Sequence, residues 1–83
     1  MEYIIAVYRS RSVSIRAYNF LLSSGVTCAL ISTPRIANVG CGLSVKFGRN
    51  VFPSVRDILS RGETFVGFFL VRSTGQGNMV TRI

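Results

Sequence analysis

The stretch YIIAVYRSRSVSIRAYNFLLSSGVTCALI, residues 3–31, decides the fold class, because its hydrophobic pattern changes period twice. Tyr3–Tyr8 is β-branched or aromatic and apolar on both faces, which is typical of a central strand. A helix capped by Ser10 or Ser12 should follow, and Gly25 should end it. The apolar residues of this helix recur along one side, at Ile15, Ala17, Tyr18, Leu21 and Leu22.

Val26–Ile31 predicts a second strand, and Leu43–Phe47 alternates apolar and polar residues like a half-buried third strand. A second helix is expected over Val51–Arg61, with a proline in its first turn, and a last strand over Phe65–Arg72. The order β-α-β-β-α-β predicts an α+β, ferredoxin-like domain. Its four-stranded antiparallel sheet would carry both helices on one face.

The last predicted strand is apolar on both faces. Phe65, Phe69 and Val71 should share one face, and Val66, Phe68 and Leu70 the other. At a sheet edge such a strand would pair with another chain, so we expect either a homodimer through Phe65–Val71 or coverage of this strand by the tail. We expect residues 1–72 to form the domain and residues 73–83 a flexible tail.

Length and composition limit the possible functions. The 83 residues suffice for one domain, and no apolar run approaches the roughly 20 residues of a membrane-spanning helix. The chain lacks histidine, the usual general base, and its two cysteines and three acids offer no tetrahedral zinc set. We therefore expect no metal, no cofactor and no hydrolytic triad. With no secretion signal and no bridging framework, both thiols should be free in the cytoplasm.

The net charge of +7 comes from nine arginines and Lys46, against three acids. Arginine forms forked contacts with carboxylates and phosphates, so the charge favours acidic partners, although a solvated basic surface has the same composition.

Cys41 lies between two glycines, at the end of a loop and the start of a strand. The amides of Gly40 and Gly42 are free to point at one spot, and such a nest of N–H groups favours an anion and hence a thiolate. Pro34 places Arg35 to add a positive charge, and Arg49 is a further candidate binding residue. Alternatively, Cys41 simply fills a tight turn.

The other cysteine, Cys28, lies within an apolar strand and is expected to be inert core. A Cys28–Cys41 bridge stays open, because sequence does not give the distance between the two residues.

Several of these motifs together resemble the selenium/sulfur carrier-like domains of bacteria. The resemblance covers roughly Tyr3 to Leu70 and leaves the tail out. It is carried by Arg9–Ser12, by Phe20-Leu21-Leu22 before Gly25, by Thr33-Pro34-Arg35 and above all by Cys41-Gly42-Leu43-Ser44-Val45-Lys46-Phe47. Where family members place a glutamate and serines, this chain has Ile36-Ala37-Asn38-Val39-Gly40.

The resemblance implies a carrier protein more than a stand-alone enzyme. Cys41 would accept a sulfane sulfur or reduced selenium atom from a donor, for example a cysteine desulfurase, and pass it to an acceptor protein. A thiolate that is reachable and held as an anion meets the needs of that chemistry.

Two other functions stay open at this point. A basic domain of this topology also suits a nucleic-acid-binding module, with Tyr8 or Phe68 as the outward aromatics. Such domains also serve as interaction modules that pair through sheet edges and need no thiol.

Overall fold

The computed structural model describes residues 1–34, 40 and 42–83 of the chain. It contains one 3-10 turn, η1, two helices and five strands. In chain order the elements are β1 (Glu2–Tyr8), α1 (Arg11–Ser23), β2 (Cys28–Ser32), β3 (Leu43–Phe47), η1 (Arg49–Val51), α2 (Phe52–Ser60), β4 (Phe65–Thr74) and β5 (Gly77–Arg82).

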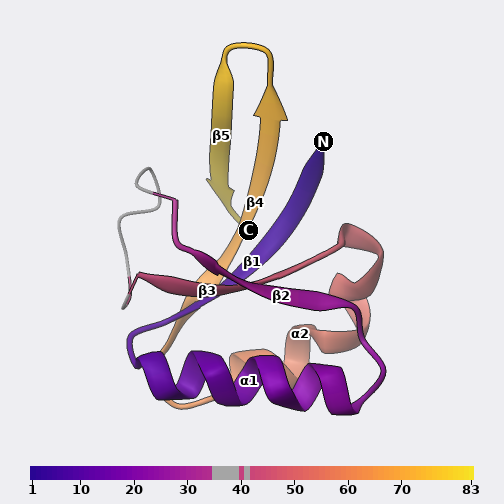
Figure 1. Ribbon diagram of the computed structural model, residues 1–83, viewed down its shortest axis with the longest axis vertical. Coiled ribbons are helices and arrows are strands. Elements are labelled where there is room, and N and C mark those ends of the chain that lie inside the picture. The colour runs from indigo at the N-terminus through magenta and orange to yellow at the C-terminus, as the bar shows by residue number, and fades with distance from the viewer. Residues whose placement is uncertain (35–39, 41) are drawn as a thin grey trace.

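The strands form one antiparallel sheet in the order β2-β3-β1-β4-β5. Both helices lie on the same side of this sheet, as Figure 1 shows. The predicted α+β class is therefore confirmed. The predicted number of four strands is wrong, because the chain adds a fifth strand after β4.

The core divides between the two faces of the sheet. Alternate β1 residues, Ile4, Ala6 and Tyr8, face the helices and contact Leu21 of α1 and Leu59 of α2 within one buried cluster. The intervening β1 residues pack on the opposite face against β4, in a smaller cluster of Ile5, Val7, Phe69 and Val71. All four are almost fully buried, so the face without helices is also part of the core.

Tyr8 fixes the end of β1. Its side chain is 1% exposed, and its hydroxyl donates a hydrogen bond to the Leu59 carbonyl at 2.8 Å. Burial raises the pKa of Tyr8 to about 12, so the phenol stays protonated as the donor. This bond anchors the C-terminal end of β1 to the last turn of α2.

The C-terminal residues cover the strand that we expected at the edge. β5 pairs with β4 along Phe69–Thr74, while β1 pairs with its other side. Residues 73–83 are therefore not a loose tail: they complete a hairpin, and the alternative of a tail that folds back is the one observed. The expected pairing of Phe65–Val71 with a second chain is contradicted at Phe68–Val71, because β5 and the Ile83 amide already occupy this edge of β4.

A β-bulge corrects the predicted faces of β4. The pairing of β1 with β4 shifts by one residue between Val7 and Tyr8. Phe65 consequently packs on the helix side with Phe68, and Val66 packs on the other side with Phe69. The simple alternation that we assumed fails at this point, since one extra residue reverses the faces beyond it.

Candidate functional site around the 33–42 loop

Hydrogen bonds close the base of the loop that joins β2 to β3. The Thr33 amide donates to the Gly42 carbonyl at 2.8 Å, which extends the β2–β3 ladder by one pair. The Thr33 and Ser44 hydroxyl oxygens lie 2.6 Å apart. Ser44 is fully buried, although its position in the alternating pattern predicted an outward side chain. This pair of Thr33 and Ser44 hydroxyl groups was not predicted from the sequence. The only sequence signal for it was that Thr33 opens the Thr33-Pro34-Arg35 motif of the loop.

Gly40 packs against the end of β1. Its φ is +78°, and a Cβ placed there would lie 2.6 Å from both the Tyr8 carbonyl oxygen and Val7 Cγ1. Gly42 has a φ of +87° with open space around it. Both positions therefore require the left-handed backbone that glycine adopts without strain. At Gly40 the neighbouring atoms also leave no room for a side chain. Backbone geometry accounts for both glycines without any bound anion.

The N-terminus of α1 lies beside the base of the loop. Ser10 caps this helix by accepting a hydrogen bond from the Val13 amide, as one of the two predicted caps. The buried Ser14 hydroxyl contacts the Leu43 carbonyl at 3.2 Å, which joins the first turn of α1 to the start of β3. Arg9 and Arg11 are exposed at this end. The loop base thus adjoins the positive end of the helix dipole, and two exposed arginines lie at the start of that helix.

Two predicted site residues, Cys41 and Arg35, lie outside the described residues. The suggested Cys28–Cys41 bridge falls outside them for the same reason. The structure does place Gly42, the neighbour of Cys41. It lies beside Thr33, at the opposite end of β2 from Cys28.

Cys28 is a half-buried free thiol on the helix side of the sheet. Its Sγ lies 3.8 Å from the Tyr18 carbonyl oxygen, as a weak donor. Burial raises the pKa of the Cys28 thiol, so it forms the nucleophilic thiolate less readily than an ordinary cysteine.

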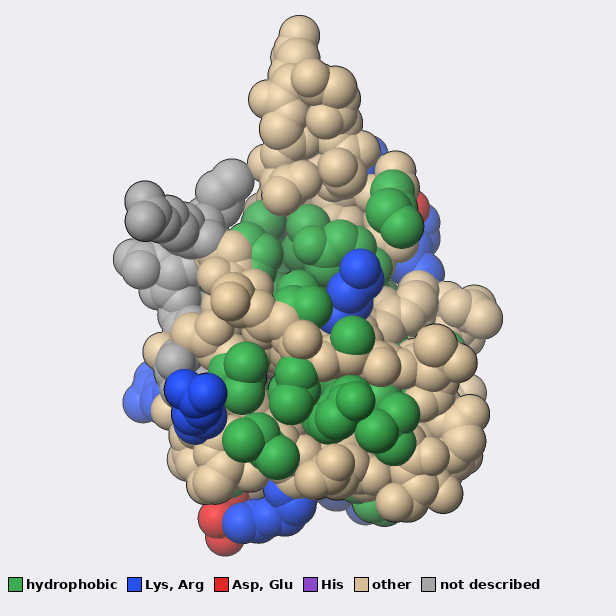
Figure 2. All heavy atoms as spheres, viewed as in Figure 1, with side chains coloured by type: hydrophobic (Ala, Val, Ile, Leu, Met, Phe, Trp, Pro, Cys, Tyr) green, Lys and Arg blue, Asp and Glu red, His purple; other side chains and the backbone are tan. Residues whose placement is uncertain are grey.

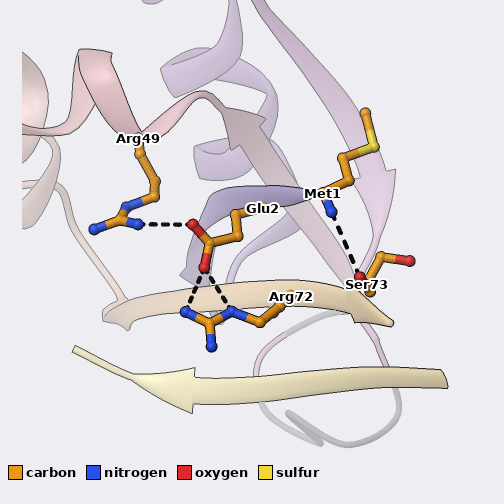
Figure 3. A network of polar contacts seen from close by, with 5 residues as sticks. All are labelled: Met1, Glu2, Arg49, Arg72 and Ser73. Carbon is orange, nitrogen blue, oxygen red and sulfur yellow. Dashed lines mark hydrogen bonds and ion pairs between the residues drawn. The ribbon is translucent and has the colours of Figure 1, made fainter. Parts of the chain in front are cut away.

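Arg49 is not brought to the loop. It follows β3, whereas the loop precedes this strand, and five residues of strand span about 13 Å. Its guanidinium instead contacts the Glu2 carboxylate at 2.7 Å, and Arg72 binds the other oxygen of Glu2 (Figure 3). The role of Arg49 in this structure is to join η1 to β1 and β4.

The two guanidinium groups, with Arg49 as the larger influence, hold the pKa of Glu2 below its ordinary value of 4.5. The free energy that this carboxylate contributes to folding is therefore fully present above about pH 4.5. It is lost as the pH falls through the lowered pKa of Glu2. We expect Glu2→Gln to lower the melting temperature modestly at neutral pH and to lower it less at about pH 3, where protonation of the carboxylate begins to remove the ion pairs. Thermal melts at both pH values measure this difference.

Glu63→Gln is the control for this experiment, because Glu63 is exposed and forms no ion pair with any other described residue. An equal effect of Glu2→Gln at both pH values would contradict the account.

The aromatic residues proposed for nucleic-acid stacking are not available. Tyr8 and Phe68 are 1% and 5% exposed and face the helices, so this prediction is wrong. On the other face, the Lys46 amine lies 4.4 Å from the Tyr3 ring centroid, and the Arg82 guanidinium lies 5.8 Å from that of Phe69. These two rings already have cationic contacts.

Within residues 1–34, 40 and 42–83, no group of three or more His, Cys, Asp or Glu side chains is placed to hold a metal ion. Neither of the described helices has the length and apolar character needed to cross a bilayer.

The fold and the loop define a small α+β domain with a cysteine-containing β2–β3 loop held closed at its base. The family described as "Putative Se/S carrier protein-like" matches residues 2–66, most of the chain, and the chain belongs to this family. No curated protein and no solved structure matches it significantly.

Proposed function

We propose that the protein carries sulfur or selenium on Cys41, between a donor protein and an acceptor protein. The family assignment supports the class of function, because the matched residues 2–66 include the whole β2–β3 loop. It leaves open which of the two cysteines in that range acts as the acceptor.

The observation that favours Cys41 is the environment of Cys28. The Cys28 thiol contacts a main-chain carbonyl, and its pKa is raised by burial. An acceptor must instead react as a thiolate and be reached by the donor. The half-buried Cys28 thiol, with its raised pKa, meets these needs poorly, and Cys41 is the remaining cysteine.

The surroundings of the loop base support the same choice. Gly40 and Gly42, on either side of Cys41, lie next to the end of β1 and the start of β3, and these adjoin the N-terminus of α1. The helix dipole, with Arg9 and Arg11, supplies positive potential on this side. Such potential favours a thiolate and the persulfide anion formed from it. In this proposal Arg35 adds a further positive charge, and Arg49 has no part.

The transfer step is an exchange without net oxidation. The Cys41 thiolate attacks the outer sulfur of a donor persulfide, so the donor S–S bond breaks and a new S–S bond forms on Cys41. The donor cysteine leaves as a thiolate and takes up the proton released by the acceptor site. The same exchange with a perselenide would deliver selenium, and a second exchange would pass the atom to the acceptor protein.

Intact-mass spectrometry tests this function directly. After incubation with a cysteine desulfurase and cysteine, the wild-type chain should gain the mass of one sulfur atom. After removal of the desulfurase, it should return to its original mass when an acceptor thiol protein is added. An unmodified chain, under conditions that load a known sulfur acceptor, would refute the proposal.

A further inference from the structure

One edge of the sheet is formed by β2, and none of the described residues protects its outer side against pairing. The bond from the Thr33 amide to the Gly42 carbonyl fixes the alternation of the β2–β3 ladder. It follows that the backbone N–H and C=O groups of Ala29 and Ile31 form the hydrogen bonds to β3. The backbone groups of Cys28, Leu30 and Ser32 then point away from the sheet, and no described residue pairs with them. The strand contains no charge, proline or bulge.

An apolar flank of α1 continues this edge on the helix side. Ile15 and Leu22 are 37% and 45% exposed, and Tyr18 lies between them at helical spacing. The contact of Cys28 with the Tyr18 carbonyl shows that this side of α1 adjoins β2. Figure 2 shows apolar side chains gathered along β2 and its junction with α1. We call the outer side of β2, together with Ile15, Tyr18 and Leu22, the β2 edge surface.

We propose that the β2 edge surface binds a second copy of this chain, with two β2 strands paired antiparallel about Leu30. A two-fold axis through Leu30 sets Leu30 opposite Leu30 of the other copy and Cys28 opposite its Ser32. All outward-pointing groups of both strands then pair. Both helices fall on the same face and run antiparallel to each other.

The dimensions of the domain suit helix contact across this axis. α1 packs equally against β2 and β3, so it lies above the space between them. With strands about 4.8 Å apart, its axis is about 5 Å from the two-fold axis, and the two helices are about 10 Å apart. This is about the distance at which helices pack directly.

The position of α1 along β2 determines which residues meet. Ser14 contacts Leu43, the pairing partner of Ser32, and Tyr18 contacts Cys28. Leu30 is therefore level with the middle of the segment from Ser14 to Tyr18. Ile15 then faces Tyr18 of the second copy, and Leu22 faces its Arg11.

The charges are compatible with this arrangement. Arg11 lies in the first turn of α1, where it opposes the helix dipole of its own chain. Antiparallel packing places it beside the C-terminal carbonyl end of the other α1, which favours a cation. Because each chain carries a net charge of +7, added salt should strengthen the association by screening the remaining repulsion.

This dimer does not depend on the proposed carrier function. Ser32, where the loop begins, is set opposite Cys28 of the other copy, so the two loop bases lie at opposite ends of the paired strands.

Sedimentation equilibrium from low micromolar to submillimolar concentration tests the proposal. The wild-type chain should approach twice the monomer mass. Leu22→Lys places a lysine opposite Arg11 of the second copy and should raise the dimer dissociation constant at least about tenfold. Phe20→Lys is the matched control, since Phe20 is also 45% exposed but lines the groove between α1 and α2. Thr81→Lys on β5 is a second control, on the other sheet edge.

Circular dichroism confirms that each variant is folded before the comparison. Loss of the dimer in Leu22→Lys alone would support the proposal. A wild-type chain that stays monomeric throughout would overturn it and leave the edge to a strand from a different protein. A dimer that Leu22→Lys does not weaken would also overturn the proposal. The same holds for a dimer that either control variant weakens as much as Leu22→Lys does.

Discussion

Replacing Cys41 with serine is expected to abolish sulfur loading by a cysteine desulfurase, whereas Cys28→Ser should load to the wild-type extent. A serine hydroxyl stays protonated at neutral pH and cannot displace a donor thiolate from a persulfide. Cys28 is not expected to substitute for the lost thiol, because its side chain is half-buried and burial raises its pKa. Intact-mass spectra of both variants beside the wild-type chain measure this difference.

The two variants control for each other, since each keeps one cysteine and changes a single atom. Loading of Cys41→Ser at the wild-type level would contradict the assignment of the acceptor. Loss of loading in Cys28→Ser alone would assign the acceptor role to Cys28 on β2 instead of Cys41 in the loop.

Gly40→Ala is expected to lower the free energy of unfolding by about 3 kcal/mol or more, whereas Gly42→Ala should cost about 1–2 kcal/mol. The two glycines share a left-handed backbone, so both variants carry the same conformational strain. Gly40 differs in its surroundings, because its new Cβ would overlap the Tyr8 carbonyl oxygen and Val7 Cγ1 at 2.6 Å. That overlap forces the loop away from β1. Urea unfolding of both variants measures the two costs.

Equal losses in the two variants would show that Gly40 does not lie against β1 as described. A larger loss in Gly42→Ala would contradict the account of the loop base outright.

The sequence predicted most elements of the fold from local patterns. The apolar strand Tyr3–Tyr8 and the alternating strand Leu43–Phe47 were found within a residue of their observed bounds. The second helix was found because Pro53 and Gly62 mark its two ends. These signals are local, so they can be recognised without knowledge of the tertiary structure.

The fifth strand was missed because its own sequence carries little of the strand signal. In β5 only Val80 is partly buried, and the other residues are exposed. The strand forms because β4 offers a long backbone edge with which it can pair. The only local signal was the turn Thr74-Gly75-Gln76-Gly77, which joins two strands in a hairpin.

The candidate site was predicted in part. Sequence marked the β2–β3 loop by its glycines, and the structure shows that Gly40 and Gly42 adopt the left-handed backbone. Arg49 was assigned to the site from its distance along the chain, but the intervening strand carries it to the far end of the sheet, where it binds Glu2. The partly buried contact of Thr33 with Ser44 depends on strand register, which sequence alone did not supply.

Locating the added sulfur within the loaded wild-type chain tests the central claim most directly. Trypsin cleavage after Arg16, Arg35 and Lys46 places the two cysteines on separate peptides, residues 17–35 and 36–46. After the persulfide is trapped by alkylation, the account predicts the extra sulfur atom on peptide 36–46, which contains Cys41. An extra sulfur confined to peptide 17–35 would contradict it.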